Sequence, residues 1–272
     1  MKNGFMKKYR YSLVLLRELV ITEFKLRYQG SALGYLWSLL KPLFLFAILY
    51  YVFVHFLKIG DGVPNWPISM LLGIVLWTFF SEITANGLSS VVSRGDVIRK
   101  INFPKYVIVI ASSVSALINL FLNFIIIGVF LIINGVDIHW SALIAPVYIL
   151  EIFIFGLGLA FILSTLFVKL RDVNYIWEIL MQALFYGSAV IYPIAVVIDQ
   201  AGVEVARLLL LNPVAQAIQD TRQALVDPST PTLYSISGSV WMSLIPIAAV
   251  IVVFIIGAVF FRKRSPYFAE EV

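Results

Sequence analysis

The chain has 272 residues, of which 61% are hydrophobic and only 13% are charged. A soluble domain carries about 25% charged residues, so this composition, with a mean hydropathy of +0.96, is typical of an integral membrane protein. A net charge of +5 can indicate a nucleic-acid partner, but so apolar a chain has little water-facing surface that could form a basic groove. The lack of cysteine excludes disulfide frameworks, thiol nucleophiles and iron–sulfur sites, and with two histidines, His55 and His139, we expect no metal site.

The first 30 residues are interrupted by charges throughout, so they neither span a membrane nor form a cleaved signal. Residues 9–29 are rich in helix formers, and Glu23 precedes Arg27 by four residues, the favourable order for a helical ion pair. We expect a cytoplasmic interfacial helix over residues 1–30. Its apolar positions form no single stripe, so lipid, other helices and a partner protein are all open as its contact surface.

Six later segments are apolar and long enough to cross about 30 Å of hydrocarbon. They cover residues 33–57, 67–93, 106–133, 140–168, 173–198 and 232–261. Their continuity excludes a β-barrel, whose strands alternate over about 10 residues. The sequence therefore predicts an all-α polytopic membrane protein with six transmembrane helices. Residues 1–272 would form one transmembrane domain, with the spans in 31–262 and a cytoplasmic tail at 263–272.

The orientation follows from the Lys and Arg residues in the short connections. With the N-terminus in the cytoplasm, 17 of the 20 positive residues lie on the inner side. The outer side keeps only Lys58, Arg207 and Arg222. The sequence therefore predicts that both termini are cytoplasmic.

The outer connection between the fifth and sixth segments has a helical pattern of its own. Residues 203–211 are apolar but too few to cross the bilayer. Asn212 and Pro213 then form an N-cap and first-turn pair that opens a polar helix containing Arg222. This pattern predicts a re-entrant or surface helical hairpin. Such a hairpin is either an outer gate of a pore or a loop that merely packs.

Two spans carry polar and aromatic residues at helical spacing. On the first span, Lys41 shares one face with a set of aromatic and imidazole residues: Trp37, Phe44, Tyr51 and His55. The fifth span repeats the pattern with Tyr175, Glu178, Gln182 and Phe185. Aromatic faces stack on sugar rings, so these stripes could line a carbohydrate pathway; the alternative is an interfacial aromatic belt. The third span carries Ser112, Ser115, Asn119 and Asn123, for which we expect interhelical hydrogen bonds.

The inner connection 94–105 predicts one short helix, capped by Asp96 and ended by Phe103 and the following proline. Basic and apolar residues alternate along it, among them Val97, Ile98, Arg99 and Ile101. A short helix of this kind suits docking to a soluble partner, although an ordinary positive inner loop has a similar composition. The chain has no phosphate-cradling G-x-x-x-x-G-K-[ST] loop, so nucleotide energy would have to come from another subunit.

Five segments of the chain carry motifs beyond their hydropathy. The longest is residues 23–43, with its Arg27-Tyr28 pair, Leu36-Trp37 pair and Pro42. The others are Leu72–Ser81, Asn102-Phe103-Pro104, Leu170–Val173, and Leu211-Asn212-Pro213 followed by Arg222. Together, and in this order along the chain, the segments resemble bacterial polysaccharide-exporting ABC transporter permeases of the ABC-2 type. One departure is Lys41, where the family usually has asparagine.

The resemblance implies a permease that forms a homodimer and pairs with two copies of a separate ATPase, which would bind ATP and Mg²⁺. It implies export of undecaprenyl-diphosphate-linked O-antigen, capsular polysaccharide or wall teichoic acid across the bacterial cytoplasmic membrane, with no cofactor or catalysis in this chain. The first and fifth spans would border the channel, and Asn212, Pro213 and Arg222 would belong to an outer gate. The ATPase contacts would be Glu23, Arg27, Asp96, Val97, Ile98, Arg99, Ile101 and Phe103.

Two alternatives to glycan export stay open. One is an ABC-2 exporter of a drug or small lipid, which has less need of an aromatic stripe. The other is an intramembrane enzyme that acts on polyprenyl phosphates through Glu82, Glu151 or Glu178, since acids at membrane depth are costly and commonly functional.

Overall fold

A computed structural model describes residues 13–23, 25, 30–101 and 103–272, and the regular structure in this part of the chain is helical. Residues 13–23 form a helix at its start. The later elements are the 3₁₀-helix η1 (Gly34–Leu36), α2 (Trp37–Leu49), the π-helix η2 (Tyr50–Phe56), α3 (Trp66–Ser93), α4 (Gly95–Lys100), α5 (Tyr106–Ile133), η3 (Trp140–Ile144), α6 (Ala145–Lys169), α7 (Val173–Tyr186), α8 (Ile194–Ala201), α9 (Val203–Leu210), α10 (Pro213–Leu225), α11 (Leu233–Ser237), α12 (Val240–Arg264), η4 (Ser265–Tyr267) and α13 (Phe268–Glu271).

Five helical segments within the described ranges are long and apolar enough to cross a membrane. They are Gly34–Phe56, Trp66–Ser93, Tyr106–Ile133, Trp140–Lys169 and Val240–Glu271. The first four confirm the predicted spans to within two residues. The last begins eight residues later than predicted, because Thr232 caps the separate short helix α11 and Gly238, at φ +64°, ends it.

The predicted fifth span, 173–198, is wrong as a single continuous helix. Helix α7 ends at Tyr186, and its 14 residues reach only about 21 Å. The backbone then leaves the helical path: Ala189 has φ +50°, and Pro193, which has no N–H to donate, precedes α8. The segment 187–193 is therefore irregular, although Ser188, Ala189, Val190 and Ile191 are fully buried.

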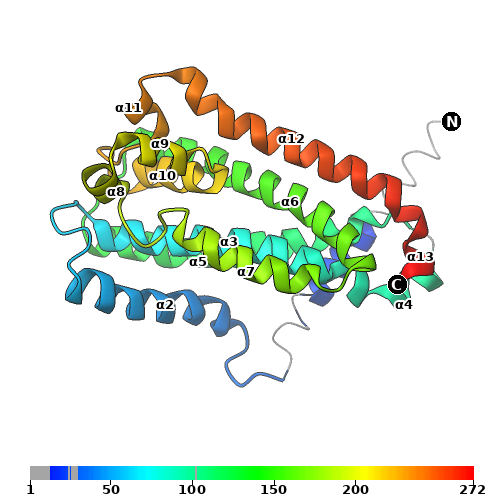
Figure 1. Cartoon of the computed structure of the whole chain (residues 1–272). Helices are drawn as coiled ribbons and strands as arrows, with labels where there is room; N and C mark the ends of the chain where they lie inside the picture. The colour runs from blue at the N-terminus through cyan, green and yellow to red at the C-terminus, as the bar shows by residue number, and fades with distance from the viewer. Residues whose placement is uncertain (1–12, 24, 26–29, 102) are drawn as a thin grey trace.

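Helix α3 lies at the centre of the bundle. It packs against α2, α5, α6, α7 and α10, and 19 of its 28 residues are buried. Helix α6 contacts α3 on one side and α12 on another, and these long helices run along the length of the molecule (Figure 1). By contrast, the α2 span is largely exposed, so one face of the molecule carries uncovered apolar surface.

Helices α8, α9, α10 and α11 gather at one end of the bundle, opposite α4 and α13 (Figure 1). A second small core joins them to the irregular segment, with Ala189, Ala206, Leu210 and Ala215 among its buried members. The predicted start of the polar helix is confirmed, because the Asn212 side chain accepts a hydrogen bond of 3.0 Å from the Val214 N–H. Most of α10 is buried, so its polar residues face protein.

The short inner helix differs from its prediction in two ways. It ends at Lys100 rather than at Phe103 and Pro104. Asp96 is not its cap: the carboxylate lies in the first helical turn and forms an exposed 2.9 Å ion pair with Arg99. An acidic residue there still stabilises the helix, because it lies near the positive end of the helix dipole.

Candidate functional site

The first-span stripe lies on the outside of the described chain. Trp37, Phe44, Tyr51 and His55 are all exposed, and Tyr51, at 66%, stacks on His55 with 5.4 Å between ring centres. The stripe continues from α2 onto the π-helix η2, which follows Leu49 and carries Tyr51 and His55. The buried residues of α2 are Ser38 and Pro42, and the Ser38 carbonyl oxygen accepts a hydrogen bond from Asn123 of α5. This uncovered aromatic face is the surface that a second chain or a passing ligand would meet.

Helix α7 presents a similar face. Tyr175, Glu178 and Gln182 are exposed, and Asn174 donates a 3.1 Å hydrogen bond to the Glu178 carboxylate. The fourth predicted member, Phe185, is half-buried, because its ring packs against Trp77 of α3 at 5.7 Å. Both α2 and α7 pack on α3, so their exposed faces belong to two neighbours of the same central helix.

Arg222 joins α10 to the irregular segment and to α3. Its side chain is fully buried, and its guanidinium donates to three carbonyl oxygens: Ser69 at 2.9 Å, Ala189 at 2.8 Å and Val190 at 2.6 Å. The guanidinium carbon also lies 5.0 Å from the centre of the Trp66 ring. Irregular backbone at membrane depth must have its carbonyls satisfied internally. Arg222 supplies the donors, and it is therefore a structural anchor of this end of the protein.

Two residues around Arg222 make close contacts that the sequence alone did not single out. Gly73 of α3 leaves room for the guanidinium: a Cβ there would overlap Arg222 Nη2 and lie 3.0 Å from the Val190 carbonyl oxygen. Ser188 receives a 2.9 Å hydrogen bond from the Asn212 amide. The Leu72-Gly73 pair stands within one of the family-like segments, but a glycine gives no sign of which side chain will fill its space.

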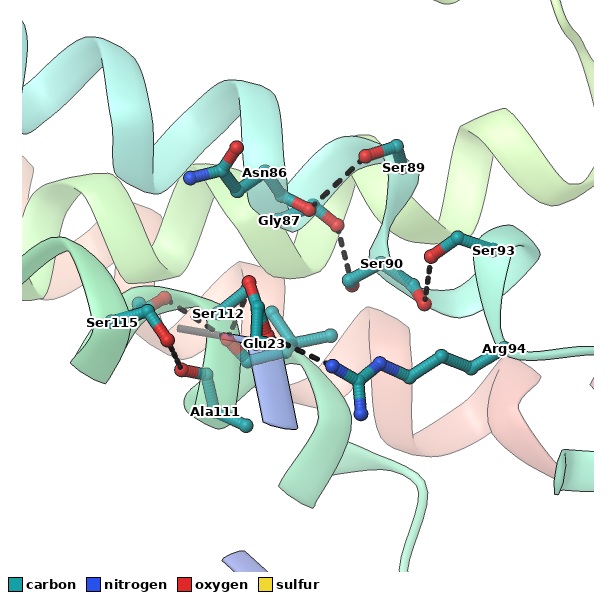
Figure 2. A network of polar contacts seen from close by, with 12 residues as sticks. Glu23, Asn86, Gly87, Ser89, Ser90, Ser93, Arg94, Ala111, Ser112 and Ser115 are labelled. Atoms are coloured by element: carbon teal, nitrogen blue, oxygen red, sulfur yellow. Dashed lines mark hydrogen bonds and ion pairs between the residues drawn. The ribbon is translucent and has the colours of Figure 1, made fainter. Parts of the chain in front are cut away.

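At the opposite end, the helix formed by residues 13–23 packs on the bundle. Arg94 reaches from the end of α3 to Glu23, with 3.0 Å between its Nη2 and the carboxylate, as Figure 2 shows. Both side chains are about four-fifths buried. Leu19 on the same helix is also buried. Contacts with protein, rather than lipid alone, therefore hold this helix. The predicted partner Arg27 lies outside the described residues.

The residues predicted to contact an ATPase divide into two groups. Ile98 and Phe103 are buried and Val97 is half-buried, so they fix α4 to the bundle. Asp96, Arg99 and Ile101 are exposed, with Ile101 at 46%.

The chain's last residues help to hold α4 in place. Arg99 donates to the Val272 carbonyl oxygen at 3.1 Å, and a Cβ on Gly95 would overlap the Val272 side chain. Lys105 donates to the Ser265 carbonyl oxygen at 2.8 Å. The segment predicted as a cytoplasmic tail, 263–272, is helical: Arg262, Lys263 and Arg264 extend α12, and the residues after them fold back as η4 and α13.

A family model for ABC-2 type transporters matches residues 14–226. The chain belongs to the ABC-2 type transporter family. The permease is 30% identical over 259 residues to a protein named "O-antigen export system permease protein RfbA" of Myxococcus xanthus, covering 95% of each chain. A protein of the same name from Klebsiella pneumoniae is 27% identical over 269 residues, covering 97% of this chain and 98% of the relative. The chain is thus the transmembrane subunit of a transporter and is not itself catalytic.

The three acids considered for intramembrane catalysis do not form one site. Glu82 accepts a 2.9 Å hydrogen bond from Asn119 of α5, whereas Glu178 is exposed on α7 and bonded by its own helix. Glu151 lies on α6, near the N-terminal end of that helix. Family membership and this separation both argue against the enzyme alternative for the permease.

Proposed function

We propose that this permease is the membrane-spanning half of an ATP-driven exporter of undecaprenyl-diphosphate-linked surface glycans. O-antigen, capsular polysaccharide and wall teichoic acid are the substrates of this kind. The observation that carries the proposal is the match over nearly the whole chain to relatives named as O-antigen export permeases. The exposed aromatic faces of α2 and α7 support it, because aromatic rings stack on sugars.

The chain crosses the cytoplasmic membrane six times as one transmembrane domain, with α7 and the irregular segment 187–193 together completing the fifth crossing. A polytopic protein can place irregular backbone at that depth because Arg222 satisfies two of its carbonyls. Two copies of the chain face each other, so that the exposed faces of α2 and α7 line the channel between them. Helices α8, α9 and α10 form the outer re-entrant gate, in which Asn212, Pro213 and Arg222 fix the start and position of α10.

Both termini and α4 lie in the cytoplasm, where the positive residues are concentrated. ABC-2 permeases pair with ATPase subunits, and in this protein two copies bind at α4 and the 13–23 helix. ATP and Mg²⁺ are held by those subunits. ATP binding closes them, and the motion passes through α4 and the Glu23–Arg94 ion pair to α3.

Replacing Ile101 with aspartate tests the docking surface. Because the Ile101 side chain is exposed, the fold should persist in this variant. A negative charge placed in an apolar docking pocket of the ATPase should weaken binding of that subunit about tenfold or more. Co-purification of the two subunits from detergent measures this. Leu170→Asp is the matched control, an exposed leucine at the same end between α6 and α7. Equal loss with both variants would show that α4 has no special part in docking.

Replacing Phe44 and Tyr51 together with alanine tests the channel face. Each ring contributes about 0.5–1.5 kcal/mol of stacking, so we expect export to slow about tenfold while dimer assembly and ATPase binding persist. The measurement is ATP-dependent transfer of undecaprenyl-diphosphate-linked glycan in vesicles containing the permease and its ATPase.

Phe121→Ala is the control for the channel variant, because Phe121 is 71% exposed but lies on α5 rather than on the stripe. Unchanged export by the double variant would favour an interfacial belt over a channel lining. Transport of a drug or short-chain lipid, with no transfer of any lipid-linked glycan, would establish the alternative exporter function.

A further inference from the structure

A cavity of about 510 Å³, lined by both polar and apolar side chains, lies between α2, α3 and α5. Pockets of about 300–1,000 Å³ are typical of small-ligand sites. The polar residues that line it and carry the argument are Lys41, Glu82, Asn86, Asn119 and Asn123. Apolar packing between three helices of a membrane bundle does not need this set of side chains, so the cavity requires an explanation.

Hydrogen bonds fix the inner wall of the cavity. Asn119 donates to Glu82 at 2.9 Å, which ties α5 to α3. Asn123 donates to the Ser38 carbonyl oxygen at 3.2 Å, which ties α5 to α2. These two bonds confirm the interhelical role expected for the asparagines, whereas Ser112 and Ser115 bond within α5. The wall is therefore preorganised.

Two side-chain amides at this wall can form further hydrogen bonds. The Asn86 amide nitrogen and the Asn119 amide oxygen are buried and have no hydrogen-bond partner among the described residues. Leaving a buried donor or acceptor unsatisfied costs about 1–3 kcal/mol. One donor and one acceptor left over beside a carboxylate is a pattern that hydroxyl groups can satisfy, because each hydroxyl both donates and accepts.

The cavity is continuous with the exposed face of α2. Trp37 and Lys41 line the cavity and also belong to the aromatic stripe. Lys41 is exposed, whereas Asn119 and Asn123 are buried. The Lys41 ammonium therefore lies at the mouth of the cavity, and the Asn119 and Asn123 amides and Glu82 lie deeper. Beyond the mouth, Phe44 and Ile48 form exposed apolar surface along the same face of α2.

We propose that this cavity binds the head of the exported amphiphile, with the first sugar held by Asn86, Asn119 and Glu82 and the lipid diphosphate held by Lys41. This proposal rests on the function proposed above and adds a site to it. The polyprenyl tail leaves the mouth over Phe44 and Ile48. Glu82 orients the ligand, because a carboxylate repels the diphosphate from the deep end and accepts hydrogen bonds from sugar hydroxyls. Lys41 attracts the phosphate as a point charge.

The ligand chemistry, a phosphate next to hydroxyl groups on a lipid, occurs in the export substrate and also in phosphatidylglycerol. The permease with its ATPase, reconstituted in phosphatidylcholine vesicles, is therefore photo-crosslinked to undecaprenyl diphosphate N-acetylglucosamine carrying a diazirine on the sugar. Unlabelled undecaprenyl diphosphate and phosphatidylglycerol serve as separate competitors. We expect labelled peptides from 78–86 and 116–123, and about tenfold weaker competition by either sugar-free lipid.

Three variants act on different parts of the cavity: Lys41→Gln at the mouth, Asn86→Leu at the wall, and Thr78→Phe, which fills the space. Each should weaken crosslinking about tenfold. Lys169→Gln, an exposed lysine at the end of α6, should leave it unchanged. Gel filtration of each complex checks folding, and if Asn86→Leu does not fold, the other two still decide the question.

If the Lys41→Gln and Thr78→Phe variants are crosslinked as strongly as the wild type, the proposed site is overturned. Competition by phosphatidylglycerol as strong as that by the glycan lipid would also overturn it and would identify a phospholipid site. The function proposed above fails separately: it fails if wild-type vesicles transfer no glycan with ATP. Export that proceeds normally in all three variants leaves that function intact and removes this site.

Discussion

Replacing Arg222 with methionine is expected to destabilise the permease by about 2–4 kcal/mol. The carbonyls of Ala189 and Val190 would lose their donors while buried, and each such loss costs about 1–3 kcal/mol. Removing the guanidinium also removes its own cost of burial, which limits the loss. Unfolding of the purified protein in detergent, followed by circular dichroism against increasing SDS, measures the change.

Arg222→Lys separates charge from geometry. An ammonium keeps the charge but lacks the planar fork that reaches three carbonyls on two elements, so we expect little rescue. The control is Arg171→Met, because Arg171 is exposed and only lies against the Phe167 ring. That change should alter stability by less than about 0.5 kcal/mol. Similar losses at Arg171 and Arg222 would show that the buried contacts have no special weight.

Replacing Gly257 of α12 with alanine should also have a large effect. A Cβ at that position would overlap the carbonyl oxygen of Gly158 on α6. In the other direction, a Cβ on Gly158 would lie 2.7 Å from the Phe254 Cα atom. Both obstacles are backbone atoms, which cannot rotate away, so the two helices must separate. Overpacking of this kind costs about 1–3 kcal/mol, and Gly257→Leu should cost more.

Gly128→Ala is the control for the glycine contact. Gly128 lies inside α5, and nothing stands within 4 Å of a Cβ built there. Alanine has the higher helix propensity, so this variant should be as stable as the wild type or more stable, by up to about 1 kcal/mol. SDS unfolding compares Gly257→Ala, Gly257→Leu, Gly158→Ala and Gly128→Ala with the wild type. Tolerance of alanine at both Gly158 and Gly257 would mean that α6 and α12 are not in backbone contact.

These contacts divide the permease into a fixed part and an exposed part. Helices α3, α6 and α12 pack closely through glycines, and Arg222 ties α10 to α3. By contrast, Tyr51, on η2 directly after α2, and Tyr175, on α7, are each 66% exposed. Small residues permit close helix approach in membranes, whereas large exposed rings need another surface to cover them.

The break in the predicted fifth span shows why hydropathy alone cannot decide whether a segment is one continuous helix. Residues 173–198 are apolar enough for a helix, and their composition predicts one. Whether the chain stays helical depends on what the rest of the protein can offer its backbone. Arg222, more than 30 residues away, donates hydrogen bonds to the carbonyl oxygens of Ala189 and Val190. These bonds stabilise the irregular backbone of 187–193 inside the membrane.

The inner helix gives the same lesson on a smaller scale. Asp96 has the side chain of a good N-cap, but α4 begins at Gly95, so the carboxylate lies one position inside the helix and pairs with Arg99. The folded-back end of the chain occupies the space beside Gly95. The residue preference predicts a cap at Asp96, whereas in the structure α4 begins one residue earlier, at a glycine that packs against a segment far away in the sequence.

By itself, the amino-acid sequence determined the membrane class, four of the spans and most of the last, the N-cap at Asn212 and the aromatic spacing on α2. Each of these depends on local composition or on helical periodicity, which any stretch of chain carries within itself. The tertiary structure alone decided where α7 stops, what Arg222 binds, why Gly73, Gly158 and Gly257 have no side chain, and which polar groups surround the cavity beside Lys41. Those features are contacts between distant segments, and their energies depend on distances of a few tenths of an ångström that no periodicity encodes.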